Sequence, residues 1–173
     1  MKTLSILTVF LMVGLLICAG CKDRLNRTFD YNDVIANCGS GQLRVRLLGT
    51  YTSSKTETTR GSPYEIFVSF RSKTDIEGQV IIRKLDLYSV ENQKSVYSLT
   101  EPRTQNLVLD SDGAYVAYFS LDKVELDFLK YSANIELEIV TSGKATPEDF
   151  KVEFDKNYEE HRTNTFWEKL MGV

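Results

Sequence analysis

Histidine is almost absent from this chain, in which His161 is the only one. A hydrolase triad needs a base beside its nucleophile, and His161 lies in a charged stretch that is typical of a solvated surface. Pairing with the thiol of Cys38 is the alternative, although no recognisable motif surrounds either residue. Zinc also needs several His or Cys ligands, so the sequence predicts no zinc centre and no catalytic residue.

Glycine-rich phosphate loops are absent as well. Neither GxGxxG nor GxxxxGK followed by Ser or Thr occurs, and the segment NCGSG at 37–41 lacks the first glycine of the G-x-S-x-G elbow. Asp110 and Asp112 are spaced like the start of a calcium loop, but the third oxygen ligand and the distal glutamate are missing. The sequence therefore favours a β-turn over weak calcium binding, and it predicts no metal and no cofactor.

Clustered positive charge is also lacking. The formal net charge is -3, and nucleic-acid binding needs a clustered basic surface, so we expect no nucleic-acid partner. Charge is nevertheless uneven, because residues 22–71 are net basic, with Arg44, Arg46, Arg60 and Arg71, and the rest is net acidic. We favour solvated strand faces over an electrostatic docking site as the explanation.

An apolar run opens the chain, in the segment MKTLSILTVFLMVGLLICAGC. Lys2 supplies a positive flank, and residues 4–17 form an apolar stretch interrupted only by Ser, Thr and Gly. A resident transmembrane helix needs ~20 apolar residues. The run is therefore marginal for a membrane span and favours a cleaved signal.

Small residues and a cysteine end this run. Ala19, Gly20 and Cys21 match the last three positions of a lipobox, and Cys18 stands where that motif prefers leucine. The segment therefore resembles a bacterial lipoprotein signal peptide. The resemblance implies that Cys21 becomes the first residue of the mature chain and carries a diacylglycerol thioether and an acylated amine. Each buried CH₂ contributes ~0.8 kcal/mol, so such palmitate-like chains hold a protein on a membrane.

The same resemblance implies a location in the bacterial cell envelope. The residue after Cys21 is Lys22 and not aspartate. If the envelope is Gram-negative, the resemblance implies that such a lipoprotein is sorted to the periplasmic face of the outer membrane. The alternatives are a cleaved secretory signal with Cys21 as an ordinary thiol, and an uncleaved signal anchor. Lipidation of Cys21 leaves Cys38 without an intramolecular partner. We expect Cys38 to pack as a small hydrophobe, with an intermolecular disulfide as the alternative.

Beyond residue 41, apolar and polar side chains alternate with the period of strands that bury one face. The predicted strands cover residues 43–47, 64–70, 79–90, 96–99, 106–109, 115–121, 135–139 and 150–154. About seven or eight short strands at such spacings indicate a mainly β protein, an antiparallel β-sandwich that is immunoglobulin-like in the broad sense, with a β-barrel as the alternative. No Cys…Trp…Cys framework supports true immunoglobulin descent.

The sequence predicts four regions. They are a cleaved lipoprotein signal peptide (1–20), a lipid anchor and tether (21–37), a β-sandwich domain (38–154) and a C-terminal helical tail (155–173). Within the sandwich we expect a loop or a long hairpin tip over 52–63, which is rich in Thr, Ser and Gly. A short turn of helix is expected over 124–129.

The predicted tail is irregular or a frayed helix at first and then a short helix over 163–171. Its apolar residues Phe166, Trp167 and Leu170 must be buried somewhere. Docking on the sandwich would close an edge of a sheet. The alternative is docking on a partner protein, because aromatic anchors are enriched at interfaces.

Three functional classes remain. We favour a membrane-anchored, non-enzymatic envelope lipoprotein that binds another protein or has a structural role, because an anchor and a strand-rich scaffold occur with little catalytic chemistry. Its expected partners are the membrane, through Cys21, and an envelope protein. The alternatives are a carrier whose Tyr and Phe side chains line a cavity for a small apolar or glycan ligand, and a carboxylate-dependent hydrolase. A packed core would also explain the aromatic residues, since β-sheets favour them.

Overall fold

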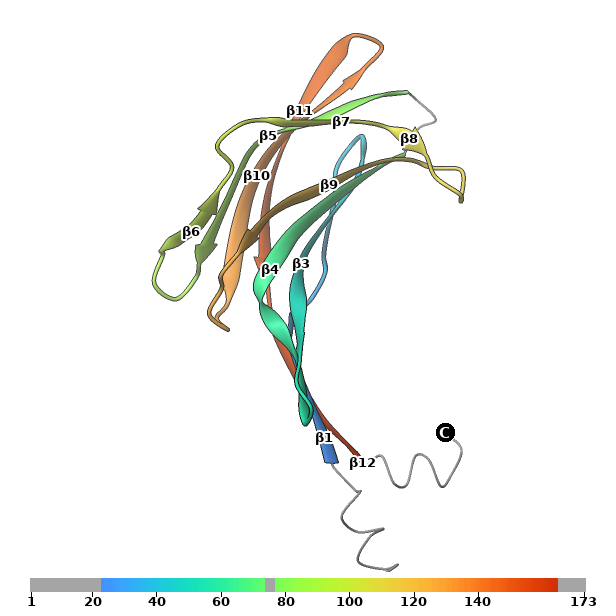
Figure 1. Ribbon diagram of the computed structural model, residues 1–173. Coiled ribbons are helices and arrows are strands. Elements are labelled where there is room, and N and C mark those ends of the chain that lie inside the picture. The colour runs from blue at the N-terminus through green and yellow to red at the C-terminus, as the bar shows by residue number, and fades with distance from the viewer. Residues whose placement is uncertain (1–22, 74–76, 165–173) are drawn as a thin grey trace, which may run out of the picture. The chain divides into compact units, whose positions relative to one another are not determined.

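The computed structural model describes residues 23–73 and 77–164, and every helix or strand within these ranges is a β-strand (Figure 1). The same ranges contain no helix with the length and apolar character needed to cross a membrane. The chain forms two compact units. Unit 1 includes residues 51–59 and the described parts of both ends of the chain, and unit 2 consists of Phe29–Thr50 and Arg60–Tyr158.

Seven strands form sheet A. They are β1 (Asp23–Tyr31), β2 (Val34–Asn37), β3 (Gly41–Ser53), β4 (Glu57–Ser72), β8 (Val108–Leu109), β9 (Tyr115–Val124) and β12 (Lys156–Asn164). The order along the sheet is β12-β1-β4-β3-β2, and β9 pairs with both β4 and β8. In β3 and β4 every second residue is buried over much of the strand, because apolar side chains occupy alternate positions.

Five strands form sheet B. They are β5 (Gly78–Ser89), β6 (Ser95–Ser98), β7 (Arg103–Asn106), β10 (Tyr131–Thr141) and β11 (Lys144–Phe154). The order is β11-β10-β5-β6, with β7 also paired to β5, and these pairs are antiparallel. Gly143 has φ 75° in the tight β10–β11 turn, a backbone conformation that favours glycine.

The two sheets share one hydrophobic core, which lies within unit 2. Ile66 and Phe70 of β4 belong to it together with Ile135 of β10 and Phe154 of β11, and none of these is more than 1% exposed. Full burial of one such side chain contributes about 1.5–3 kcal/mol. Unit 2 is therefore sandwich-like, with two sheets that face each other across a common core.

Three tyrosines from both sheets meet in this core. Tyr31 of β1 and Tyr64 of β4 come from sheet A, and Tyr131 of β10 comes from sheet B. The ring centroid of Tyr31 lies 5.2 Å from that of Tyr64 and 5.8 Å from that of Tyr131, in edge-on geometry. Aromatic pairs in this geometry contribute about 0.5–1.5 kcal/mol beyond the area that they bury.

The hydroxyls of two of these tyrosines hold the connection over residues 125–130, where the chain passes from β9 in sheet A to β10 in sheet B. Tyr131 donates to the carbonyl oxygen of Asp127 at 3.0 Å. The Tyr31 hydroxyl lies 3.1 Å from the carbonyl oxygens of both Asp127 and Leu129. Because a buried hydroxyl without a partner is destabilising, the tyrosines and this connection depend on each other.

Two segments expected to be irregular or helical are strands. The tether expected over 21–37 is, from Asp23 onward, largely β1 and β2, and the tail expected over 155–173 is mostly β12 as far as Asn164. The helix expected over 163–171 is therefore wrong at its first two residues, and its remainder lies outside the described residues. The side chains of β12 are mostly exposed, so the apolar alternation that reveals a strand is missing there.

Unit 2 contains most of the region expected to be a β-sandwich domain. Unit 2 begins at Phe29 and extends to Tyr158, beyond both ends of the sandwich expected over 38–154, and it leaves out residues 51–59. Of the two expectations for 52–63, the long hairpin is found, because β3 and β4 continue to a tip over residues 54–56.

The expected helical turn over 124–129 and the β-barrel alternative are both wrong. After Val124 the chain is irregular as far as β10. Leu126 is only 5% exposed and its N–H donates to the hydroxyl of Ser62 at 3.1 Å, so side chains satisfy main-chain groups that a helix would satisfy internally. The barrel is excluded because the described strands form two separate sheets.

The buried tyrosines predict a loss of stability at alkaline pH. Burial raises the pKa of Tyr64 to about 12, and its hydroxyl donates to the carbonyl oxygen of Phe29 at 2.7 Å. A group whose pKa is raised by folding stabilises the protein below its unfolded pKa, and this contribution is lost as the pH rises through the folded value. We expect the free energy of unfolding to fall between about pH 10 and pH 12, with Tyr64 contributing up to ~1.4 kcal/mol per pH unit.

Urea denaturation at stepped pH, with Tyr64→Phe as the comparison, measures this contribution. At pH 8 we expect the variant to be less stable than the unmodified protein, because phenylalanine cannot form the hydrogen bond. Above pH 10 we expect its free energy of unfolding to decline less steeply with pH. An equally steep decline in both proteins would contradict the assignment.

Two buried serines provide a matched test of hydrogen-bond satisfaction. Ser89 of β5 and Ser132 of β10 are each 1% exposed. The Ser132 hydroxyl donates to the carbonyl oxygen of Val152 at 2.9 Å, whereas the Ser89 hydroxyl has no hydrogen-bond partner among the described residues. We expect Ser132→Ala to lower the free energy of unfolding by ~1 kcal/mol and Ser89→Ala to leave it unchanged or raise it by up to ~1 kcal/mol. Chemical denaturation measures both, and equal losses would be evidence against the geometry.

Candidate functional site

Several residues expected to carry function lie beyond the residues that the structure describes. These are Cys21, the predicted lipidation site, and Phe166, Trp167 and Leu170, the predicted docking residues. Lipidation and docking therefore stay predictions, and the candidate site is built from the outer faces of the two sheets.

The two residues considered for thiol chemistry have separate surroundings. Cys38 is a free, partly buried cysteine that packs against the core, in agreement with its expected packing. Its sulfur lies 3.3 Å from the Ser40 hydroxyl and 3.4 Å from the carbonyl oxygen of Gly41. His161 lies on β12 with a side chain that is 71% exposed, 3.7 Å from a carboxylate oxygen of Glu159.

The turn expected from Asp110 to Gly113 is present. The N–H of Gly113 donates to the carbonyl oxygen of Asp110 at 3.0 Å, and Gly113 has φ 81°. The Asp110 carboxylate accepts hydrogen bonds from the N–H of Ser111 at 2.8 Å and from the hydroxyl of Tyr118 at 2.9 Å, and together they lower the pKa of this carboxyl. In the described ranges there is no group of three or more His, Cys, Asp or Glu that could hold a metal ion.

A surface of mixed aromatic, apolar and basic character covers part of the outer face of sheet A within unit 2. Opposite residues of antiparallel strands point to the same face. The outward pairs of β4 and β9 are Phe67 with Ser120, Ser69 with Tyr118, and Arg71 with Val116. We call Phe67, Ser69, Arg71, Val108 and Tyr118 the sheet A surface. Val116 is only 5% exposed and is not counted in it.

Tyr118 is the exposed aromatic side chain of this surface. It is 45% exposed, and its ring centroid lies 6.1 Å from that of Phe67. Its hydrogen bond to Asp110 raises the pKa of the Tyr118 hydroxyl. The side chain is thus held at both ends, by a ring contact and by a charge-assisted hydrogen bond.

The short edge strand β8 extends the sheet A surface with apolar side chains. Val108 lies opposite Val116 of β9 and is 54% exposed, and the following Leu109 is 63% exposed. Within the described residues, β8 pairs only with β9, so its other edge has main-chain groups available for a partner.

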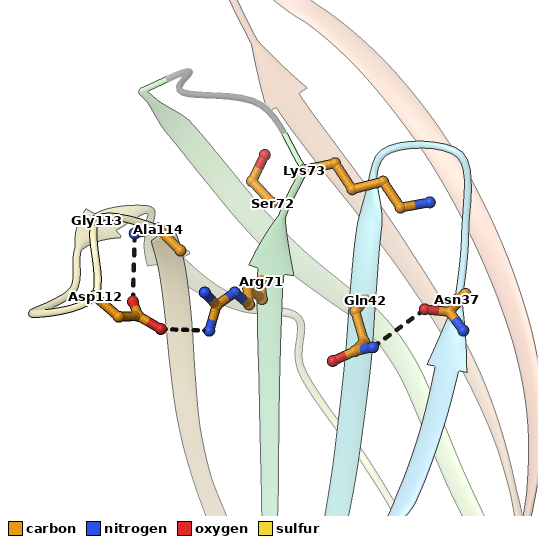
Figure 2. A pocket seen from close by; sticks show the side chains of 8 residues that line it. All are labelled: Asn37, Gln42, Arg71, Ser72, Lys73, Asp112, Gly113 and Ala114. Carbon is orange, nitrogen blue, oxygen red and sulfur yellow. Dashed lines mark hydrogen bonds and ion pairs between the residues drawn. The ribbon is translucent and has the colours of Figure 1, made fainter.

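A hollow of about 410 Å³ lies at the end of this surface, between the β2–β3 connection and the turn before β9 (Figure 2). Two side-chain pairs flank it. Arg71 lies 2.6 Å from a carboxylate oxygen of Asp112, and the amide of Gln42 donates to that of Asn37 at 3.2 Å. The Lys73 ammonium donates to a main-chain carbonyl of the β2–β3 connection at 2.7 Å. The polar groups around the hollow are therefore largely satisfied by one another.

A smaller hollow of about 240 Å³ continues onto the sheet A surface and shares Gln42 and Arg71 with the first. Tyr118, Val116 and Arg44 also line it. The two hollows are thus adjacent, and together they extend from Arg71 to the aromatic side chain of Tyr118.

Aspartates balance the arginines of the basic half of the chain. The ion pairs join Arg44 and Arg46 to Asp33, Arg60 to Asp30, and Arg71 to Asp112. Partial burial acts to raise the pKa of Asp33, but hydrogen bonds from Arg44 and Arg46 outweigh it and lower the pKa below its usual value. These arginines are fixed in orientation and locally compensated, as expected for solvated strand faces.

Carboxylates of the acidic half also lie in ion pairs. On sheet B, Glu138 pairs with Arg83 at 2.6 Å, and Asp86 and Glu136 both lie near the Lys84 ammonium, at 3.3 and 3.5 Å. These ion pairs hold the three carboxylates on the outer face of sheet B.

Sequence reasoning missed the outward aromatic residues. Phe67 stands between the core residues Ile66 and Val68, and Tyr118 between Ala117 and Phe119. An aromatic residue at a position of the period-two pattern that should be polar is a detectable signal. It was obscured because β-sheets favour aromatic residues on both faces.

Comparison of the chain with protein-family models, with curated proteins and with solved structures finds no match.

The contact between Tyr118 and Asp110 predicts a measurable change in titration. Tyr118→Phe removes one of two hydrogen bonds to the Asp110 carboxylate and leaves that from the N–H of Ser111. We expect the pKa of Asp110 to rise toward its usual value without reaching it, because hydrogen bonds to the charged form hold it down. NMR titration of the side-chain carboxyl carbon measures the change. An unaltered Asp110 pKa would contradict the contact.

Proposed function

We propose that the protein is a lipid-anchored lipoprotein of the bacterial cell envelope that binds another protein and has no catalytic activity of its own. The resemblance of the leader to a lipoprotein signal peptide supports Cys21 as the anchor, on the periplasmic face of the outer membrane if the envelope is Gram-negative. The observation that carries the binding role is the sheet A surface, where Tyr118 and Val108 are exposed beside Arg71.

The composition of this surface suits protein recognition. Tyr and Arg are enriched among the residues that dominate binding energy at interfaces, because each combines apolar contact with hydrogen bonding. Tyr118 is held by Phe67 and Asp110, and Arg71 by Asp112. Side chains that are already ordered lose less conformational entropy on binding, which favours a fixed interface.

The carrier alternative with an aromatic-lined cavity has less support. The largest buried side chains include Tyr64, Tyr131, Phe70 and Phe154, and all four belong to the common core. Aromatic residues that pack together in a core cannot also line an opening for a ligand. Packing in the core of a β protein therefore explains these four aromatic residues.

A finer description of the fold is also proposed, namely that unit 2 is immunoglobulin-like in the broad sense. Its support is the antiparallel pairing and a chain that passes from sheet A to sheet B between β4 and β5 and returns between β7 and β8. Connections of this kind are typical of Greek-key sandwiches.

Replacing the anchor residue tests the first part of the proposal. We expect Cys21→Ser to move the protein from the detergent phase to the aqueous phase in detergent partitioning, because no acyl chains are attached. Cys38→Ser is the matched control and is expected to remain in the detergent phase. Retention of Cys21→Ser in that phase would rule out the lipid anchor.

Chemical crosslinking in the native membrane, followed by identification of the proteins that copurify, tests the second part. We expect one reproducible partner whose yield falls about tenfold or more in Tyr118→Ala and in Arg71→Ala, the loss typical of interface hot spots. Tyr88→Ala, which changes a tyrosine on sheet B, is the matched control and is expected to retain the partner. A partner captured equally by all variants would contradict the assignment of the binding surface.

A further inference from the structure

A polar hollow lies on the outer face of sheet B, within unit 2. It has a volume of about 540 Å³ and is lined by Asp86, Tyr88, Gln93, Ser95, Ser98 and Asn134, which we call the sheet B hollow. Sites for small molecules have volumes of roughly 300–1,000 Å³. The hollow is therefore large enough to take a small ligand.

Three adjacent strands align its side chains. Asp86 of β5 lies opposite Asn134 of β10 on one side and opposite Ser98 of β6 on the other. Opposite residues of antiparallel neighbours share a face, with Cβ atoms about 4.5–5.5 Å apart. A carboxylate, an amide and a hydroxyl thus form one row across the sheet. Tyr88, two residues after Asp86 on β5, adds an aromatic ring beside that row.

Two polar side chains of this hollow have no protein partner among the described residues. Within the described ranges, neither the Tyr88 hydroxyl nor the Asn134 amide makes a hydrogen bond to another residue. The Gln93 amide nitrogen donates to the carbonyl oxygen of Val90 at 2.9 Å, which leaves its side-chain oxygen as an acceptor. The hydroxyls of Ser95 and Ser98 lie 3.4 Å apart and are paired with each other.

One carboxylate, that of Asp86, lines the sheet B hollow, and it is paired with a cation. It lies 3.3 Å from the Lys84 ammonium, which also lies 3.5 Å from a carboxylate oxygen of Glu136. A cationic ligand would compete with Lys84, and an anionic ligand would meet the carboxylate. The electrostatics therefore favour a ligand that is neutral and rich in hydrogen-bonding groups.

From this arrangement we propose that the sheet B hollow binds a neutral saccharide unit, through the Tyr88 ring and the row of Asp86, Asn134 and Ser98. A pyranose presents C–H groups on its faces, which suit an aromatic ring. Its neighbouring hydroxyls each donate and accept, which suits a carboxylate beside an amide. The site lies on the other sheet from the proposed protein-binding surface and does not depend on it.

Binding of neutral trisaccharides to the full-length protein tests the proposal. The protein is kept in lauryldimethylamine oxide, because a detergent with a sugar headgroup would compete for the site. Saturation-transfer NMR and titration are carried out with trisaccharides of glucose, mannose, galactose and N-acetylglucosamine. We expect at least one of them to bind with a Kd of about 1 mM or tighter, as a shallow site allows. No binding by any of the four overturns the proposal.

Variants test the location of the site. Tyr88→Ala is expected to weaken binding about tenfold and Asn134→Ala about fivefold, whereas Tyr88→Phe keeps the ring and loses less. Tyr118→Ala on sheet A is the matched control and is expected to bind unchanged. Thermal unfolding of each variant verifies that it is folded, and Tyr88→Phe with Asn134→Ala carries the test if Tyr88→Ala does not fold. Binding that survives in every sheet B variant, or is lost in Tyr118→Ala, overturns the assignment.

Discussion

Buried tyrosine hydroxyls constrain how the two sheets of unit 2 pack. Tyr31 and Tyr131 belong to different sheets, yet both hydroxyls lie within hydrogen-bond distance of the carbonyl oxygen of Asp127 in the connection between the sheets. A hydroxyl buried without a partner costs about 1–3 kcal/mol, so the rings can pack into the core only if this connection takes its observed path. The packing of the two sheets and the path of the connection therefore depend on each other.

This constraint leaves the outer faces of the sheets for function. The inner faces are committed to the common core, and the two outer faces differ in chemistry. The face of sheet A has fixed aromatic and basic side chains, with Tyr118 bonded to Asp110, and such ordered residues suit a protein interface. On the face of sheet B, the Tyr88 hydroxyl and the Asn134 amide have no protein partner among the described residues. Different ligands are expected because the two faces offer different unsatisfied chemistry.

The sequence predicted the strands that bury one face, because their period of two is set by the core. The segments 64–70 and 135–139 are examples, and both lie within the observed strands. It did not predict β12 over 156–164, because a strand whose side chains are mostly exposed has no apolar alternation. The connection after Val124 was also missed, since its conformation depends on tyrosines that are distant in sequence. The candidate sites were also missed. Their residues are distant in sequence and become neighbours only through the register of paired strands.

The central claim is that the outer face of sheet A binds a protein partner and the outer face of sheet B does not. Site-specific photo-crosslinking in the native membrane tests it most directly, with a photoreactive phenylalanine analogue at position 118 in one strain and at position 88 in another. Both positions are tyrosines on outward faces of central strands, 118 on sheet A and 88 on sheet B. The account predicts a discrete protein adduct from position 118 and none from position 88. Adducts of equal yield from both positions, or none from position 118, would contradict it.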